Sequence, residues 1–250
     1  AVNTMISTLK GDTYKDLKGV DTVSKNNYNN VYTTGLSQND LLVGLRGTTA
    51  TNGKSSGYLG GVAGFNTVNG TITGAATGKW FVYGDNTTDE SKIGGMIGMN
   101  EATGEVKLLV NCAAVRRFTR TDGKNDDDTT YRSDRKIAYV GGVIGVQQNT
   151  TDDKWVISEC VNLGTVFDSG SNYIGGIIAS WLKNGGTIEK SFNFGSLSTN
   201  TNYGNGSGTV GGIVGFFDQP TPGGTANILS CQNHGDILSC GNWTNNTKRG

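Results

Sequence analysis

A six-residue motif built around a glycine pair recurs five times along this chain and constrains its fold more than any other feature. The five copies read LGGVAG, IGGMIG, VGGVIG, IGGIIA and VGGIVG. Their first glycines are Gly60, Gly94, Gly141, Gly175 and Gly211, so the spacings are 34, 47, 34 and 36 residues. Periods of this length are typical of repeat architectures, and the chain is predicted to stack five copies of one structural unit.

Further positions recur downstream of each glycine pair. An aliphatic column reads Ile72, Leu109, Ile157, Ile188 and Ile228; a small-residue column reads Ala75, Cys112, Cys160, Ser191 and Cys231; an apolar column reads Phe81, Phe118, Val166, Leu197 and Ile237. Between the last two columns, Asn162, Asn193 and Asn233 are each followed two residues later by Gly164, Gly195 and Gly235. Asn and Gly tolerate left-handed backbone, so this pattern predicts a turn repeated in register, with Asn side chains that bond one another between units.

The composition favours turn-rich strands over helices, because the chain has 40 glycines and only 2 prolines and lacks long runs of helix formers. We therefore predict an all-β fold: a right-handed parallel β-solenoid, or β-helix, of about five coils with an N-terminal cap. Each coil is expected to contain about three strands, one at the glycine pair, one at the aliphatic-small block and one after the Asn-x-Gly turn. A β-propeller is the alternative, but its blades need about 40 residues or more.

The repeat also predicts the organisation of the chain. Residues 1–56 lack the motif and are expected to form an N-terminal cap or a degenerate first coil, the latter around Leu41 to Gly47. Residues 57–240 form the five-coil solenoid, and residues 241–250 are a C-terminal tail or the start of a following segment. The 47-residue spacing is explained by an inserted polar loop at 119–136.

The glycine-pair motif together with GTIEKSFNFG, at Gly186 to Gly195, resembles the GLUG repeats of large bacterial surface proteins. The resemblance covers residues 58 to about 240. It implies a stalk or adhesive module, and it carries no catalytic residues that could be transferred to this chain.

Strand alternation around the glycine pair predicts an unusual outer face. Leu59 and its equivalents, with Ala63 and its equivalents, are expected to face the core. The opposite face would then carry Tyr58, Tyr139 and Tyr173 beside an aliphatic column of Val62, Met96, Val143, Ile177 and Ile213. An outward strip of this kind would suit a partner or a stacking sugar, and the three tyrosines are the predicted ligand-binding residues. The alternatives are that another layer covers the strip or that the glycines introduce a bulge that reverses the alternation.

Other candidate sites have simpler interpretations. The segment TDGKNDDDTT, at Thr121 to Thr130, offers oxygen ligands for calcium but lacks the spacing of an EF-hand, so a solvated loop is favoured. Cys112 and Cys160 share the small-residue column and are interpreted as buried free thiols rather than a disulfide. A Cys231–Cys240 disulfide is a separate alternative, and His234 is expected to pack at a turn.

The sequence therefore predicts a non-catalytic extracellular or cell-surface module for adhesion or display, with no cofactor and no metal. Its expected partner is a host or bacterial surface protein or a glycan. Because 21 basic residues balance 21 acidic ones, nucleic acid is not expected as a partner, and no segment is long enough for membrane insertion. The alternatives are a carbohydrate-binding or carbohydrate-cleaving β-helix and a fibre-forming or phage-type receptor-binding segment. The chain is expected to be a monomer or to assemble end to end into a fibre.

Overall fold

The computed structural model consists of short parallel β-strands. It describes residues 42–45, 57–78, 81–85, 90–118, 137–149, 155–168, 173–182, 185–200, 209–218, 226–240 and 248–249, and within these ranges it contains no helix. The strands form five sheets, called A to E below, and all the strand pairings in them are parallel.

Two of the sheets have six strands, and along the chain a sheet A strand and then a sheet B strand come before each bend at the glycine pair. Sheet A contains β1 (Leu42–Leu45), β5 (Phe81–Asp85), β10 (Ala114–Phe118), β15 (Val166–Asp168), β20 (Leu197–Asn200) and β25 (Ile237–Cys240). Sheet B contains β2 (Gly57–Gly60), β6 (Glu90–Gly94), β11 (Ile137–Gly141), β16 (Tyr173–Gly175), β21 (Thr209–Gly211) and β26 (Lys248–Arg249).

The other three sheets follow the motif along the chain. Sheet C contains β3 (Ala63–Asn66), β7 (Ile97–Asn100), β12 (Ile144–Gln148), β17 (Ile178–Leu182) and β22 (Val214–Asp218). Sheet D contains β4 (Ile72–Thr73), β8 (Val106–Lys107), β13 (Val156–Ser158), β18 (Thr187–Glu189) and β23 (Asn227–Leu229). Sheet E contains β9 (Val110–Asn111), β14 (Val161–Asn162), β19 (Phe192–Asn193) and β24 (Gln232–Asn233).

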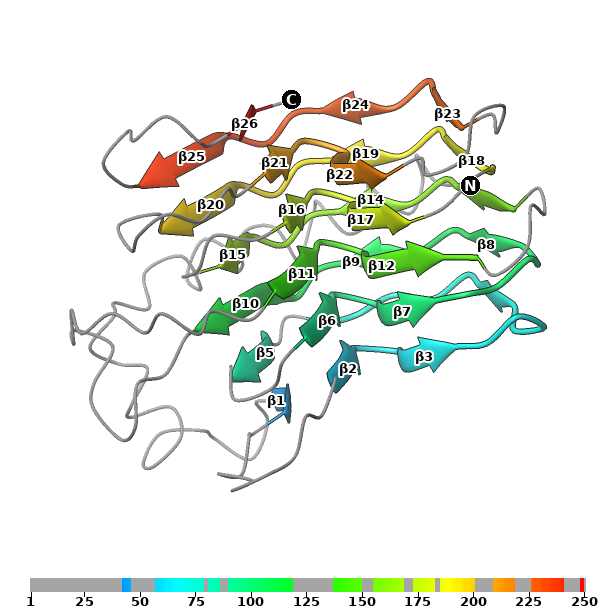
Figure 1. Ribbon diagram of the computed structural model, residues 1–250, viewed down its shortest axis with the longest axis horizontal. Coiled ribbons are helices and arrows are strands. Elements are labelled where there is room, and N and C mark those ends of the chain that lie inside the picture. The colour runs from blue at the N-terminus through cyan, green and yellow to red at the C-terminus, as the bar shows by residue number, and fades with distance from the viewer. Residues whose placement is uncertain are drawn as a thin grey trace.

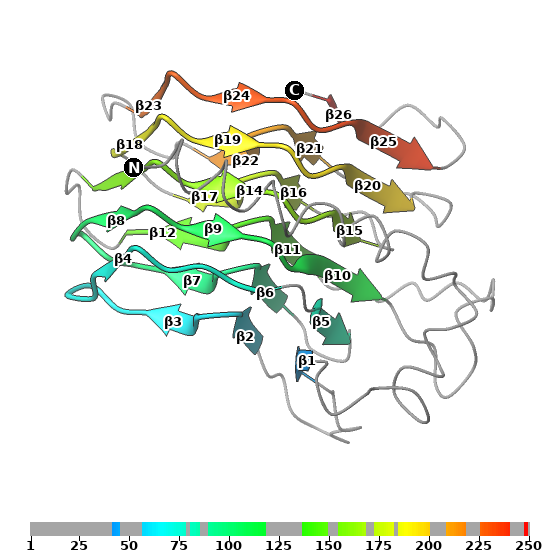
Figure 2. The same ribbon diagram turned by 180° about the vertical axis from the view of Figure 1, so that it is seen from behind.

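The chain passes through sheets B, C, D, E and A in that order, and one such pass is called a coil. The five coils span residues 57–85, 90–118, 137–168, 173–200 and 209–240, and the first contributes only an isolated bridge, Ala76 to Val110, to the region of sheet E. Figure 1 shows the coils stacked from β2 and β3 at the bottom to β25 at the top, and Figure 2 shows sheets D, E and A from behind. This all-β arrangement of stacked parallel strands is that of a parallel β-solenoid, as predicted, and it excludes an antiparallel propeller.

The prediction of about three strands in a coil was wrong: the coil at 137–168 has five, because neither the glycine pair nor the aliphatic-small block lies within one strand. The first glycine of each pair ends a sheet B strand, and the second glycine forms, with the residue after it, a bend that leads into a sheet C strand. A Cβ on the first glycine would lie 1.8 Å from the carbonyl oxygen of the residue three positions later, at both Gly141 and Gly175. Only glycine leaves room for a bend this tight.

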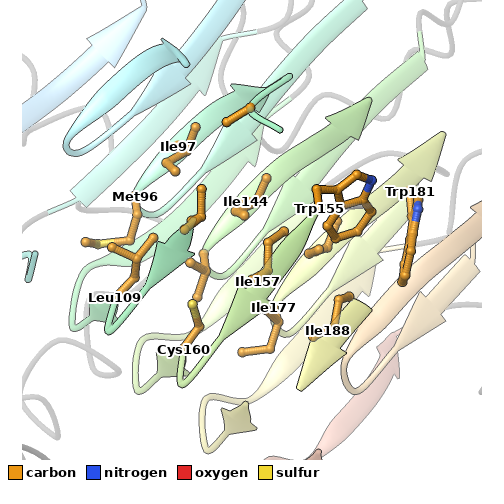
Figure 3. Close-up of a cluster of buried hydrophobic side chains, with 14 residues drawn as sticks. Met96, Ile97, Leu109, Ile144, Trp155, Ile157, Cys160, Ile177, Trp181 and Ile188 are labelled. Carbon is orange, nitrogen blue, oxygen red and sulfur yellow. The ribbon is translucent and has the colours of Figure 1, made fainter. Parts of the chain in front are cut away.

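This bend also overturns the predicted outward aliphatic column. Met96, Val143 and Ile177 are fully buried and join the same core cluster as Ile97 and Ile144. Figure 3 shows Met96, Ile97, Ile144 and Ile177 within this cluster. Two consecutive residues point inward because the chain changes direction between them, so period-2 alternation does not hold across the motif.

The predicted bonding between stacked asparagines is confirmed and extends further than expected. Thr77 Oγ1 donates to Asn111 Oδ1 (2.8 Å), and Nδ2 of Asn111, Asn162 and Asn193 each donates to Oδ1 of the next asparagine (2.8, 2.8 and 2.7 Å), ending at Asn233. Each asparagine Nδ2 also donates to the carbonyl oxygen two residues later in its own coil, at 2.8 to 2.9 Å. We call this series the asparagine ladder.

The ladder explains the second glycine of each pair. A Cβ on Gly142 would lie 2.4 Å from Asn162 Cγ, and one on Gly176 would lie 2.5 Å from Asn193 Cγ. The glycine-pair motif and the asparagine motif therefore face each other across the interior, and the absence of a side chain on one makes room for the amide on the other.

The Asn-x-Gly segment does not form the left-handed turn that the sequence suggested. Asn162 and Asn193 lie in strands, and positive φ occurs at the junction of sheets D and E, at Gly74, Leu108, Glu159, Lys190 and Ser230. Gly164 and Gly195 are needed for a different reason. A Cβ on either would lie 1.8 Å from a carbonyl oxygen of the preceding coil, that of Ala113 or Gly164.

The alignment of the second coil was wrong by three residues. Val106, not Leu109, pairs with Ile157, and Val115, not Phe118, pairs with Val166. Cys112 therefore does not share the column of Cys160. It follows Asn111 in an apolar cluster with Val110, Val161 and Leu163, whereas Cys160 lies in the main core.

At the ends of the stack the structure describes one extra strand on each side. β1 adds to sheet A beside β5, in the segment predicted as a degenerate coil, and β26 adds to sheet B beside β21. The rest of the predicted cap at 1–56, the inserted loop at 119–136 and the remainder of 241–250 lie outside the described residues.

Candidate ligand-binding corner

The predicted tyrosines lie on the outer face of sheet B, where the bend at the glycine pair brings that face against sheet C. We call the place where these two faces meet the aromatic corner. Its sheet B side is the register column Tyr58, Lys92, Tyr139, Tyr173 and Thr209. Its sheet C side is the column Phe65, Met99, Val146, Ser180 and Phe216.

The corner has a floor of very small residues, namely Gly64, Gly98, Gly145, Ala179 and Gly215. They are the last letters of the five repeat motifs. A Cβ at Gly98 would lie 2.5 Å from the backbone nitrogen of Leu59, and one at Gly215 would lie 2.2 Å from the carbonyl oxygen of Ile174. Small residues here let sheet C fold closely onto sheet B, so that outer side chains of the two sheets meet.

Aromatic contacts run along the corner from coil to coil. The rings of Tyr139 and Tyr173 are stacked, with centroids 5.3 Å apart and planes 18° from parallel. Tyr173 also stacks on Phe216 across the corner at 4.4 Å. In the first coil Tyr58 meets Phe65 at 5.3 Å, with the planes tilted by 31°. These distances are typical of favourable ring pairs, so the corner is held rigidly by its own side chains.

The three tyrosines differ in how accessible they are. Tyr58 is 36% exposed and its neighbour Phe65 is 42% exposed, whereas Tyr139 is only 8% exposed and Tyr173 is half-buried. Tyr139 packs with Val146 and Ala179 in a cluster that Tyr173 also contacts. The part of the corner that can receive a ligand is therefore the first coil, and the less exposed tyrosines continue the same register column beyond Lys92.

A lysine stands in the tyrosine column. Lys92 is buried at 7% exposure, and its Nζ lies 5.1 Å from the centroid of the Tyr58 ring. This is a cation–π geometry, which stabilises the ammonium in a place with little water. The corner thus combines two exposed rings with a fixed positive charge.

Two hydroxyl groups of the corner have no hydrogen-bond partner, Ser180 Oγ and Thr209 Oγ1. Both belong to the columns around Tyr173, where the other sheet C positions are apolar. The sequence pattern predicted the tyrosines but not Phe65, Ser180 and Phe216. Each stands directly after the last letter of its motif, and that small last residue was the signal for a second wall.

The remaining candidates are placed as follows. Cys112, Cys160 and Cys231 are free thiols, as favoured for the first two, and burial raises the pKa of Cys160 to about 12. His234 stacks on Phe194 with ring centroids 5.0 Å apart and contacts Gln232 Oε1 at 2.9 Å, which confirms its packing role. The Asp-rich segment lies outside the described residues.

Two features are absent from the described residues. No group of three or more His, Cys, Asp or Glu side chains there is arranged to hold a metal ion. The same part of the chain has no helix with the length and apolar character needed to cross a membrane.

Comparison of the chain with protein-family models, with curated proteins and with solved structures finds no match. The resemblance to GLUG repeats stays a prediction from the motifs.

Proposed function

We propose that the protein is a non-catalytic bacterial surface module that binds a glycan or a surface protein through the aromatic corner. The observation that carries the proposal is the exposed Tyr58–Phe65 pair, set on a scaffold in which the same column continues as stacked rings. Rings that are exposed yet fixed are well suited to binding, because little side-chain entropy is lost when a ligand packs on them.

The scaffold supports a role in adhesion or display. Parallel pairing in five sheets and the asparagine ladder fix each coil on the next, so the corner keeps its shape along the stack. The finer features proposed with it are a right-handed winding, which parallel crossover connections strongly prefer, and an N-terminal cap within residues 1–56. The proposed location is extracellular or at the cell surface.

A glycan array tests this function. The wild-type protein is compared with the double variant Tyr58→Ser, Phe65→Ser, and the matched control is Phe217→Ser. Phe217 is 39% exposed, close to the two corner rings, but it lies on the last coil against Trp181. Binding that is lost in the double variant and retained in the control supports the corner. Binding that survives in both variants places the site elsewhere.

The assembly state is a separate proposal. At the C-terminal end of the stack, β22, β23, β24 and β25 are the last described strands of sheets C, D, E and A. Open strand edges favour pairing with a further chain, which is the basis for end-to-end assembly into a fibre. Size exclusion and electron microscopy at increasing concentration distinguish a monomer from a fibre.

A further inference from the structure

We propose that the first coil of the aromatic corner selects a sugar that carries a carboxylate, such as a uronic acid residue of an acidic polysaccharide. This rests on the proposed function, because it assigns a ligand class to the same corner. The observation behind it is the combination of Tyr58, Phe65 and the Lys92 ammonium within one coil spacing.

The two rings supply the apolar part of the site. Tyr58 and Phe65 come from the two walls of the corner, and their planes are tilted by 31°, so they make an open, angled platform. Their exposed fractions of 36% and 42% leave ring surface for a ligand to cover. A pyranose ring presents a flat C–H face that packs on such a surface, and its hydroxyls stay in water.

Lys92 supplies the charge. Its ammonium is 5.1 Å from the centre of the Tyr58 ring, so a sugar resting on that platform has a positive charge within reach of its own substituents. An ammonium has three donor hydrogens, so it can hold a partner within the protein and still donate to a ligand carboxylate. Because Lys92 is only 7% exposed, its charge is screened less by water and salt than that of a surface lysine.

A single lysine beside the two aromatic rings fits a sugar that carries one carboxylate better than it fits a chain of several phosphates. The column beyond Lys92 continues with Tyr139, Tyr173 and Thr209, which carry no positive charge. The whole chain has equal numbers of basic and acidic residues. Single-stranded nucleic acids also stack on aromatic side chains, but they are bound along basic grooves that neutralise several phosphates.

The decisive experiment changes the ligand and leaves the protein intact. Binding of polygalacturonate to the wild-type protein is measured by calorimetry beside the same polymer with its carboxylates reduced to alcohols. Removing a charge-assisted contact is expected to weaken binding about tenfold. Equal binding of the two polymers overturns the carboxylate assignment and leaves the corner as a neutral glycan site. Binding of neither polymer overturns the carboxylate assignment, and together with a blank glycan array it also removes glycan binding from the proposed function. Tighter binding of an oligothymidylate than of polygalacturonate also overturns the assignment.

Variants then locate the charge. Lys92→Met is expected to lose the preference for the carboxylated polymer, and Lys92→Arg is expected to keep most of it. The control is Lys107→Met, which removes a lysine in sheet D that pairs with Glu105 at 2.6 Å. Circular dichroism confirms folding of each variant. A preference that survives in folded Lys92→Met, or that Lys107→Met abolishes, shows that Lys92 is not its source. If Lys92→Met does not fold, the loss of preference in Tyr58→Ser decides whether the corner is the site.

Discussion

The central coils and the last coil carry the same sequence pattern but differ in how well they bury it. Ile157 and Ile188 are 1% and 0% exposed, whereas Ile228, in register with them in the last coil, is 49% exposed. The local backbone geometry is the same in both regions. Ser230 in the last coil has a φ of 53°, close to the 55° of Glu159 in a central coil. Asn233 donates a hydrogen bond to the carbonyl oxygen two residues later, as Asn162 does. Backbone conformation is therefore set within each coil, while burial is supplied by the neighbouring coil.

The largest effect that tests this comparison is truncation of the aliphatic column. Ile188→Ala is expected to destabilise the protein by about 4 kcal/mol, because it leaves a cavity between two coils. Ile228→Ala is expected to cost about 2 kcal/mol or less, since Ile228 is already 49% exposed to water. Denaturant unfolding measures both. Equal losses would show that the last coil is as well covered as the centre.

The asparagine ladder gives the next largest effect. Asn162→Ala removes an acceptor from Asn111 and a donor to Asn193, and it leaves buried polar groups without partners, so a loss of about 3 kcal/mol is expected. Asn233 is exposed, and Asn233→Ala is expected to cost about 1 kcal/mol. Thermal unfolding of the two variants compares their losses of stability. A larger loss for Asn233→Ala than for Asn162→Ala would show that burial does not determine how much each ladder asparagine contributes.

The cysteines extend the comparison to pH. The pKa of Cys160 is raised from 9.0 to about 12 by burial, and that of half-buried Cys231 is raised for the same reason. Because burial disfavours the thiolate, the folded protein keeps the Cys160 proton at a pH where the unfolded chain loses it. The contribution of Cys160 to the free energy of unfolding is therefore fully present below pH 9 and is lost as the pH rises from 9 towards 12. The Cys160 contribution is expected to fall by about 1 kcal/mol between pH 8 and pH 10.

The measurement for this prediction is the difference in unfolding free energy between wild type and Cys160→Ala at the two pH values. The same difference for Cys231→Ala is expected to change less. A pH-independent difference for Cys160→Ala would mean that its thiol ionises normally in the folded protein.

The smallest expected effect on stability is relief of left-handed backbone strain, and it is expected to be the same in the central coils and in the last coil. Lys190 and Ser230 have φ of 49° and 53°, a left-handed conformation that costs a side-chain-bearing residue about 1 kcal/mol. Replacing either by glycine relieves this cost but raises the entropy of the unfolded chain, so a net gain of about 0.5 kcal/mol is expected for each. Unequal gains in thermal unfolding would show that neighbouring coils also contribute to the strain.

Some of the site could be predicted from sequence because it repeats. The tyrosines share one position relative to the glycine pair, and the structure places them in one register column. Phe65 and Phe216 could not be assigned to the same site, because alternation was extended through the motif as if it were one strand. The error has a physical cause: the bend depends on close contacts that strand alternation does not report, first with the carbonyl oxygen three residues later and then with backbone atoms of neighbouring coils.

The alignment error in the second coil has a similar origin. Leu109 and Val106 are both apolar, and so are Phe118 and Val115, so composition alone did not distinguish the two registers. The ladder distinguishes them, since Asn111 must meet Asn162 to bond it. A register that depends on one buried amide is visible only when the neighbouring coil is in place.

The repeat by itself determined that the protein is a stack of similar units, because units of this length can bury their apolar face only against one another. The glycine-rich composition, with few helix formers, determined that those units are built from β-strands. Tertiary structure alone decided that the aliphatic column after each glycine pair is core, that the tyrosines share their corner with sheet C, and that only the first coil leaves its rings exposed. Those outcomes depend on which atoms of neighbouring coils approach one another, and no local pattern along the chain indicates those contacts.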